Sequence, residues 1–235
     1  MRQFHWWRTV FYLIPAVSLY TIVLGTISLL STIVDRTGDF AHRCARAWSI
    51  LILKTTGVRV RVTGLEHLGS LGSCVLAANH QSIYDIPIVF ASVPLQLRIV
   101  AKESLGRIPF MGWHLRGAGH LLVDRRNPGS DIVTKMARLV REGSSLIAFP
   151  EGTRSVDGTV GRFKKGSVLV VIDAGLPIVP VSISGSRHVM KKGRLMVCPG
   201  EVRLTIHAPI PTGGVPRAAA PTLAAQVREI VATAV

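Results

Sequence analysis

An uncharged stretch near the amino terminus constrains this chain more than any other feature. Residues 9–34 are 26 consecutive residues without Asp, Glu, Lys or Arg. As an α-helix this stretch would extend about 39 Å, which exceeds the roughly 30 Å hydrocarbon core of a bilayer. The sequence therefore predicts one membrane-spanning helix, or two shorter pieces broken near Pro15 or Gly25. By length alone, the alternative is a helix buried in a protein core.

Basic residues lie on both sides of the apolar stretch. Arg2 and Arg8 precede it, and further arginines follow it. Because positive residues mark the cytoplasmic side, a single crossing would leave one basic flank outside, so we favour re-entrant or interfacial attachment over spanning. Residues 40–54 are typical of an amphipathic helix with Trp48 at headgroup depth. We therefore expect residues 1–54 to anchor the chain at the cytoplasmic face of the cell inner membrane.

The chain as a whole is basic and apolar. Its 235 residues include 28 Lys and Arg against 13 Asp and Glu, which gives a formal net charge of +15. Only 17% of the residues are charged, against about 25% in typical soluble domains. A positive excess attracts nucleic acid or an anionic membrane, and the apolar bias favours the membrane. Since no zinc-finger spacing or RNA-binding aromatic signature is present, we expect no nucleic acid partner.

The rest of the chain, residues 55–235, alternates short apolar runs with helical patterns. Residues 58–63 alternate strictly between apolar and polar, as a half-buried strand does. Further apolar runs bounded by turn residues lie at 73–78, 97–101, 120–124, 144–150 and 177–185, and helical patterns lie at 130–143, 164–175 and 221–235. This alternation predicts an α/β domain with a mixed sheet flanked by helices. Ser130 is the expected N-cap of its helix, and Pro180 favours an edge strand or a bulge.

A cluster of polar residues follows the first of these buried runs. Within the stretch AANHQSIYD, four residues separate His80 from Asp85. On a regular helix the two side chains would lie on different faces, so they meet only if the chain turns after His80 and a helix begins near Ser82 or later. A carboxylate on one imidazole nitrogen would fix the tautomer and leave the other nitrogen free to take a proton. The alternative is a histidine and an aspartate that stand at this spacing by chance.

A second polar turn, FPEGTRS, covers residues 149–155. Its Gly152 would let a phosphate approach backbone N–H groups, and its Arg154 could bind phosphate bidentately. The alternative is an ordinary turn with a solvated arginine. Residues 102–113 begin with another cation, Lys102, at the end of a predicted strand.

Other polar residues are weaker candidates. Arg125 and Arg126 end another apolar run, where they could help to bind substrate or form a solvated pair. Residues 191–192, both lysine, could belong to a basic face that meets phosphates. We expect His114 and His120 to be structural or surface histidines, and we expect no metal site.

Four blocks in this order and spacing resemble the glycerolipid acyltransferase family, in particular its bacterial 1-acyl-glycerol-3-phosphate acyltransferases. Residues 79–85 resemble its NHxxxxD block, and residues 102–112 its KxxLxxxPxxG block. Residues 149–155 resemble its FPEGTRS block, and residues 179–181 match the fourth. The resemblance covers residues 55 to 210, and no motif position departs from the pattern.

The resemblance implies transfer of a fatty acyl group from a thioester to the sn-2 hydroxyl of lysophosphatidic acid, giving phosphatidic acid. The catalytic residues would be His80, the general base that removes the hydroxyl proton, and Asp85, which orients it. No cofactor is implied, and the donor would be acyl-CoA or acyl-carrier protein. Glycerol-3-phosphate or a lyso-ornithine lipid is an alternative acceptor. A non-catalytic protein that binds anionic lipid is an alternative of another class.

The resemblance also implies a set of substrate-binding residues. Lys102 and Arg154 would bind the acceptor phosphate with help from the Gly152 backbone, and Glu151 would position Arg154 or the glycerol. The implied substrate-binding residues are Lys102, Glu151, Gly152, Thr153 and Arg154.

Overall fold

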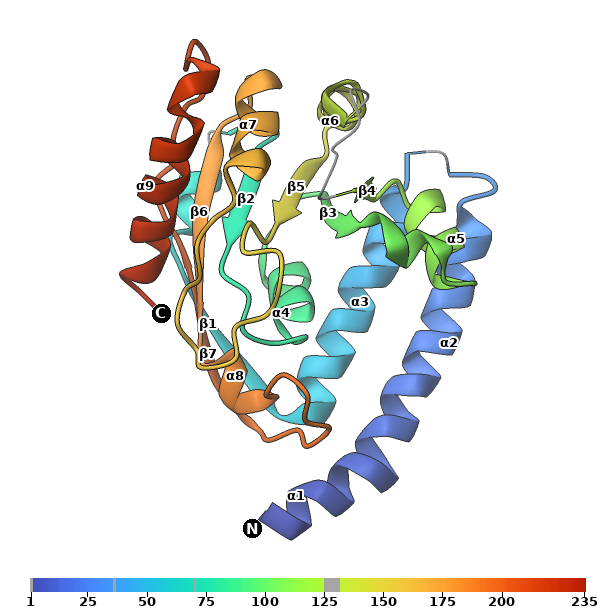
Figure 1. Cartoon of the computed structure of the whole chain (residues 1–235). Coiled ribbons are helices and arrows are strands. Elements are labelled where there is room, and N and C mark those ends of the chain that lie inside the picture. Colours follow the sequence, from blue (N-terminus) through green and yellow to red (C-terminus); the bar gives the residue numbers. More distant parts are fainter. Residues whose placement is uncertain (1, 36, 70, 125–131) are drawn as a thin grey trace.

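The computed structural model describes residues 2–35, 37–69, 71–124 and 132–235. Within them a seven-stranded sheet has the order β1-β7-β6-β2-β5-β3-β4 (Figure 1). Its strands are β1 (Val58–Thr63), β2 (Val75–Ala78), β3 (Leu97–Lys102), β4 (Leu121–Val123), β5 (Ser145–Ala148), β6 (Ile178–Ser184) and β7 (Gly200–Ile206). Neighbouring strands pair in parallel except β6 and β7, which are antiparallel. The predicted mixed sheet is confirmed.

Helices cover both faces of the sheet, as Figure 1 shows. One face packs on α3 (Asp39–Thr56) and α4 (Asp85–Ser92), and the other on α6 (Ile132–Arg141), α7 (Lys165–Asp173) and α9 (Ala220–Ala232). Strand β2 is buried on both faces, which explains why its residues are all apolar. Leu76 and Ala78 join one core cluster, while Val75 and Ala77 join the other. A strand buried on both faces needs apolar side chains at every position.

The apolar amino-terminal stretch forms one continuous helix. It comprises α1 (Arg2–Arg8), a π-helical turn η1 (Thr9–Leu13) and α2 (Ile14–Ser31). Of the two alternatives, the single helix is present, and the helix does not break at Pro15 or Gly25. Pro15 cannot donate a backbone hydrogen bond, and the wider π turn precedes it, with the Ile14 N–H donating to the Thr9 carbonyl. Such turns inside α-helices absorb local irregularity without ending them.

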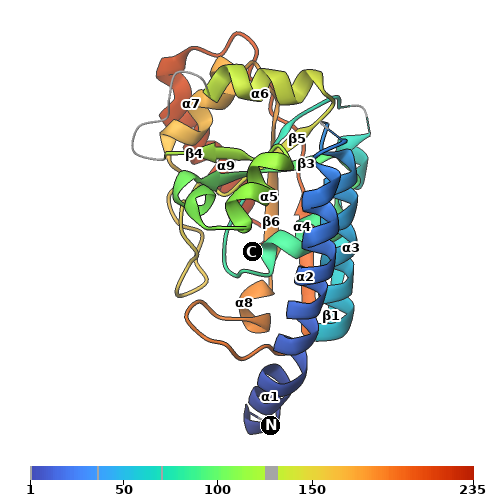
Figure 2. The same ribbon diagram turned by 90° about the vertical axis from the view of Figure 1, so that its right-hand side faces the viewer.

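This helix is long, apolar and largely uncovered. Gln3–Ser31 spans 29 residues with a mean hydropathy of 2.0, and 11% of its most apolar window is buried inside the protein. The length corresponds to about 44 Å, enough to cross a bilayer by length and composition. The helix is not a buried core helix, which was the alternative, because most of its own surface is exposed. Figure 2 shows the helix running beside α3 along one side of the molecule.

Helix α3 joins the amino-terminal helix to the sheet. On one side the Trp48 Nε1–H donates to Thr21 Oγ1 of α2 at 3.0 Å, so this indole faces α2; its place at headgroup depth stays a prediction. On the other side Ile52 and Leu53 lie in the core cluster between α3 and the sheet. The amphipathic pattern of residues 40–54 therefore serves packing against the α/β domain.

Pro180 is the clearest departure from expectation in the sheet. It lies in β6, an interior strand between β7 and β2, so the predicted edge position is wrong. The Pro180 carbonyl accepts from the His207 N–H, on the β7 side. The N–H and C=O of one strand residue point to the same side, so the N–H that proline lacks would also point toward β7. The β6–β7 ladder ends there, at Val181 and Ile206, so no ladder hydrogen bond is lost.

The remaining segments are short helical turns in the loops between these elements. They are η2 (Leu65–Leu68), η3 (Glu103–Arg107), α5 (Met111–Gly117), α8 (Ser186–Val189) and η4 (Arg217–Ala219). The proposed N-cap Ser130 and the candidates Arg125 and Arg126 lie outside the described residues.

Candidate active site

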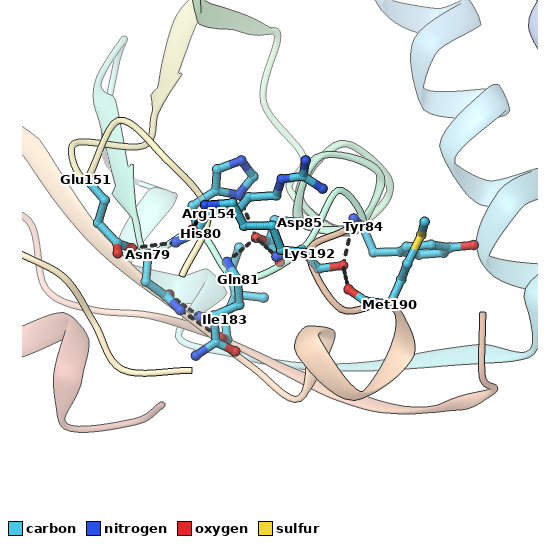
Figure 3. A network of polar contacts seen from close by, with 11 residues as sticks. Asn79, His80, Gln81, Tyr84, Asp85, Glu151, Arg154, Ile183, Met190 and Lys192 are labelled. Atoms are coloured by element: carbon cyan, nitrogen blue, oxygen red, sulfur yellow. Dashed lines mark hydrogen bonds and ion pairs between the residues drawn. The ribbon is translucent and has the colours of Figure 1, made fainter. Parts of the chain in front are cut away.

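His80 and Asp85 meet across a strand–turn–helix unit. Strand β2 ends at Ala78, the chain turns, and α4 begins at Asp85, as the spacing required. Asp85 Oδ2 accepts backbone N–H groups from Gln81 at 2.7 Å and Ser82 at 2.9 Å. These bonds close the turn and bring the same oxygen to 2.7 Å from His80 Nδ1 (Figure 3). A short carboxylate side chain therefore builds the turn and holds the imidazole.

The surroundings of the pair favour a base on the second imidazole nitrogen. The Asp85 side chain is fully buried, and that of His80 is 17% exposed. Since a carboxylate accepts, Nδ1 is the donor, and the tautomer leaves Nε2 with its lone pair. The His80 ring also stacks on Phe149, with centroids 4.2 Å apart.

The FPEGTRS turn lies beside His80 because β2 and β5 are parallel neighbours, with Ala77 opposite Ala148. The Ser155 N–H donates to the His80 carbonyl at 2.7 Å. The Glu151 carboxylate accepts the His80 N–H on Oε1 at 2.7 Å and the Gly161 N–H on Oε2 at 2.9 Å. Burial raises the pKa of Glu151, and these two N–H groups act in the opposite direction. Glu151 thus contacts main chain and, among the described residues, makes no hydrogen bond or ion pair with Arg154, one of its two expected partners; its contact with the glycerol stays a prediction.

Gly152 shapes the same turn. Its φ is +76°, in the left-handed region that glycine adopts without strain. Its N–H donates to the Phe149 carbonyl at 3.0 Å. This N–H therefore stabilises the turn, and the expected help of the Gly152 backbone in binding phosphate stays a prediction.

Two cations border the His80–Asp85 pair (Figure 3). Lys192 Nζ donates to Thr153 Oγ1 at 3.1 Å and to the Arg154 carbonyl at 2.9 Å. Among the described parts of the chain, no acidic side chain pairs with Lys192 or with the Arg154 guanidinium. Two cations without a neutralising acid favour an anionic ligand.

Lys102 lies at the end of β3, exposed, on the same edge of the sheet. Strand β5 lies between β3 and β2, so Lys102 is two strands away from the strand that carries His80. Since all three strands run in parallel, their carboxyl ends open on one side, where ligands of such sheets bind.

Polar residues that sequence reasoning left without a role fix the His80 turn. The Asn79 amide donates to the Ile183 carbonyl at 2.9 Å and accepts the Ile183 N–H at 2.7 Å. Gln81 Nε2 donates to the Gly158 carbonyl, and Ser82 Oγ to the Met190 carbonyl, both at 2.7 Å. Their position beside His80 in the motif was the only sequence signal for them.

The other two histidines weighed above have structural contacts. His120 Nδ1 accepts the Ile99 N–H at 3.1 Å, and burial lowers the pKa of His120 to about 3. His114 Nδ1 lies 3.3 Å from Ser28 Oγ of α2. Both contacts agree with the structural interpretation of these side chains.

An apolar cavity of about 150 Å³ adjoins the FPEGTRS turn. It lies between the sheet and helices α6 and α7, and Phe149 and Gly152 form part of its wall. Most of its other walls are aliphatic, including Val100, Leu121, Met136 and Val171.

Within the described residues, a buried carboxylate on an imidazole and two cations without an acidic partner lie together at one edge of a mixed sheet, which makes this edge the candidate active site. A family model described as Acyltransferase matches residues 59–184. The chain therefore belongs to the acyltransferase family.

Relatives with related names were found among both characterised proteins and solved structures. The chain is 34% identical over 175 residues to a chloroplastic 1-acyl-sn-glycerol-3-phosphate acyltransferase of Brassica napus, covering 73% of this chain and 50% of that protein. It is 31% identical over 164 residues to the 1-acyl-sn-glycerol-3-phosphate acyltransferase of Borreliella burgdorferi, covering 69% and 66%. The crystal structure of the 1-acyl-sn-glycerophosphate acyltransferase of Thermotoga maritima matches with a TM-score of 0.82 at 28% identity, covering 100% of this chain and 96% of that one. The match spans about half the length of the first plant relatives.

Proposed function

We propose that this protein transfers a fatty acyl group from a thioester donor to the sn-2 hydroxyl of lysophosphatidic acid. The observation that carries the proposal is the 2.7 Å His80–Asp85 contact with Arg154 and Lys192 beside it. The names of the relatives support the same acceptor. A phosphate held by the cations would bring the acceptor hydroxyl near His80.

The proposed reaction needs one base and no acyl-enzyme. His80 Nε2 takes the proton of the acceptor hydroxyl, and Asp85 stabilises the resulting imidazolium. The alkoxide oxygen attacks the thioester carbonyl, and the tetrahedral intermediate collapses by breaking the carbon–sulfur bond. The thiolate leaves and takes the proton back from His80. Acyl-CoA and acyl-carrier protein both supply such a thioester.

The substrates in this proposal are apolar, and the molecule offers apolar surface for them. The cavity beside Phe149 suits part of an acyl chain, because its walls are largely aliphatic. The helix Gln3–Ser31 would hold the protein at an anionic membrane, and we place it at the cytoplasmic face of the inner membrane by re-entrant or interfacial attachment. The active site would then lie at the membrane surface, where the lipid acceptor is found.

Thiol release from acyl-CoA, with and without lysophosphatidic acid, tests the proposal. The wild type should release thiol only with acceptor, and His80→Ala should lose about 10²- to 10⁴-fold in kcat while folding stays intact. Arg154→Ala should chiefly raise the KM for the acceptor. Near-normal turnover by folded His80→Ala would refute the mechanism. A panel with glycerol-3-phosphate and a lyso-ornithine lipid tests the acceptor, and vesicle binding without thiol release would indicate a lipid-binding protein.

A further inference from the structure

The main chain of His80 is held as firmly as its side chain. Its N–H donates to Glu151 Oε1, and its C=O accepts the N–H of Ser155, both at 2.7 Å. Both partners belong to the turn after β5, and Glu151 lies 71 residues from His80 in sequence. The position of the general base therefore depends on a loop from another strand.

The Glu151 carboxylate continues this connection to a third segment. Its second oxygen accepts the Gly161 N–H at 2.9 Å, and the residue is 8% exposed. Because each oxygen takes a backbone donor, the side chain bridges the turn after β2 and the loop before α7. Burial raises the pKa of this carboxyl, and the two N–H donors oppose that effect.

The absence of a side chain at Gly161 leaves room for the Glu151 carboxylate. A Cβ built on Gly161 would lie 2.8 Å from Glu151 Oε2, closer than real Cβ atoms approach, and 3.6 Å from its Cδ, which is an ordinary contact. The backbone of Gly161 is outside the left-handed region, so close packing on the carboxylate, and not φ, explains the glycine.

We propose that Glu151 is a positioning residue that fixes the main chain of His80 against the loop containing Gly161, and that it does not bind the acceptor. The inference deepens the proposed function and rests on it for its kinetic consequences. A shift of the His80 main chain moves the imidazole relative to the acceptor hydroxyl, and displacements near 1 Å cost about 10²-fold in rate. Loss of Glu151 should therefore lower kcat and leave acceptor affinity nearly unchanged.

Glu151→Gln is the direct test, because an amide of the same shape accepts one of the two N–H groups and turns its own donor toward the other. We expect kcat to fall about 10- to 100-fold, with less than a twofold change in acceptor KM. Gly161→Ala should lower kcat in the same way by displacing the carboxylate, and the double variant should lose less than the product of the two effects. Glu229→Gln on the exposed side of α9 and Gly213→Ala, whose Cβ would meet nothing within 4 Å, are the matched controls.

Amide hydrogen exchange gives a readout that does not depend on activity. The N–H groups of His80 and Gly161 should exchange at least tenfold faster in Glu151→Gln than in the wild type, while the controls leave both unchanged. Unchanged exchange, or a raised acceptor KM with kcat preserved, overturns the inference. If the wild type acylates no acceptor, the proposed function fails, and exchange still decides the role of Glu151. If Glu151→Gln does not fold, Gly161→Ala carries the same comparison.

Discussion

The imidazole of His80 lies over the phenyl ring of Phe149, with ring centroids 4.2 Å apart and planes inclined by 24°. The proposed base thus receives three restraints from one turn, since Glu151 and Ser155 hold its main chain. The motifs around His80 and Phe149 therefore work as one unit, although they come from different strands.

Phe149→Leu tests the stacking contact. Leucine keeps an apolar side chain but lacks the flat face, and aromatic pairs contribute about 0.5–1.5 kcal/mol beyond area burial. We expect kcat for acyl transfer to fall about 2- to 10-fold, with an unchanged acceptor KM. Steady-state kinetics at saturating donor measure this, with the melting temperature as control. A variant with wild-type kcat would show that the stack does not orient the imidazole.

Asp85→Asn replaces the carboxylate by a neutral amide. This amide then faces the backbone N–H groups of Gln81 and Ser82, which donate to the carboxylate in the wild type. The imidazolium loses its stabilising partner, so kcat should fall about 10²- to 10⁴-fold. The melting temperature should fall as well, because Oδ2 also accepts the Gln81 and Ser82 N–H groups. Kinetics and thermal unfolding measure the two effects separately. A kcat within tenfold of the wild type would contradict the assigned role.

Lys192→Gln tests whether the charge of Lys192, and not only its hydrogen bond to the turn at Arg154, contributes to phosphate binding. Glutamine is able to donate to the Arg154 carbonyl, as Lys192 does at 2.9 Å, but it carries no charge. We expect the KM for lysophosphatidic acid to rise about 3- to 10-fold, as for loss of an exposed charge contact of roughly 1 kcal/mol, and its dependence on salt to weaken. Lys165→Gln, at an exposed position of α7, is the control. An unchanged KM at low salt would exclude Lys192 from the phosphate site.

Acid should weaken the fold through two buried histidines. Burial lowers the pKa of His42 to about 4 and that of His120 to about 3, whereas both have a pKa near 6.5 in an unfolded chain. Below pH 6.5 the unfolded state binds more protons, so stability falls as the pH falls from about 6.5 toward 4. Each histidine contributes up to about 1.4 kcal/mol per pH unit.

Urea unfolding in detergent at several pH values measures this slope. His120→Gln keeps an acceptor for the Ile99 N–H and does not titrate, so its slope should be shallower than that of the wild type. The exposed His188→Gln should keep the wild-type slope. Equal slopes for all three proteins would rule out this explanation.

Ile22→Lys tests the amino-terminal helix as membrane anchor. Ile22 is 66% exposed on α2, and membrane binding of an interfacial helix scales with the apolar area that it buries, which a lysine there reduces. Binding to anionic vesicles, measured by sedimentation, should weaken at least tenfold relative to the control Ile22→Leu. Unchanged binding would place the membrane contact elsewhere.

The sequence by itself determined several strands of the sheet and the turn that carries His80 and Asp85. Strict alternation at Val58–Thr63 marked a half-covered strand, and continuous apolar runs marked strands buried on both faces. The spacing of His80 and Asp85 required a turn before α4, which is present. These features follow from the two-residue period of a strand and from a five-residue spacing, so a local pattern of residues carries them.

Only the tertiary structure decided which segments support the site. Glu151 reaches His80 across 71 residues of sequence, and Lys192 reaches Thr153 across 39. Pro180 is tolerated in an interior strand because a ladder ends beside it, and α3 faces the sheet as well as α2. Such outcomes follow from strand order and loop packing, which bring distant residues together after the chain has folded, and no local pattern of residues encodes them.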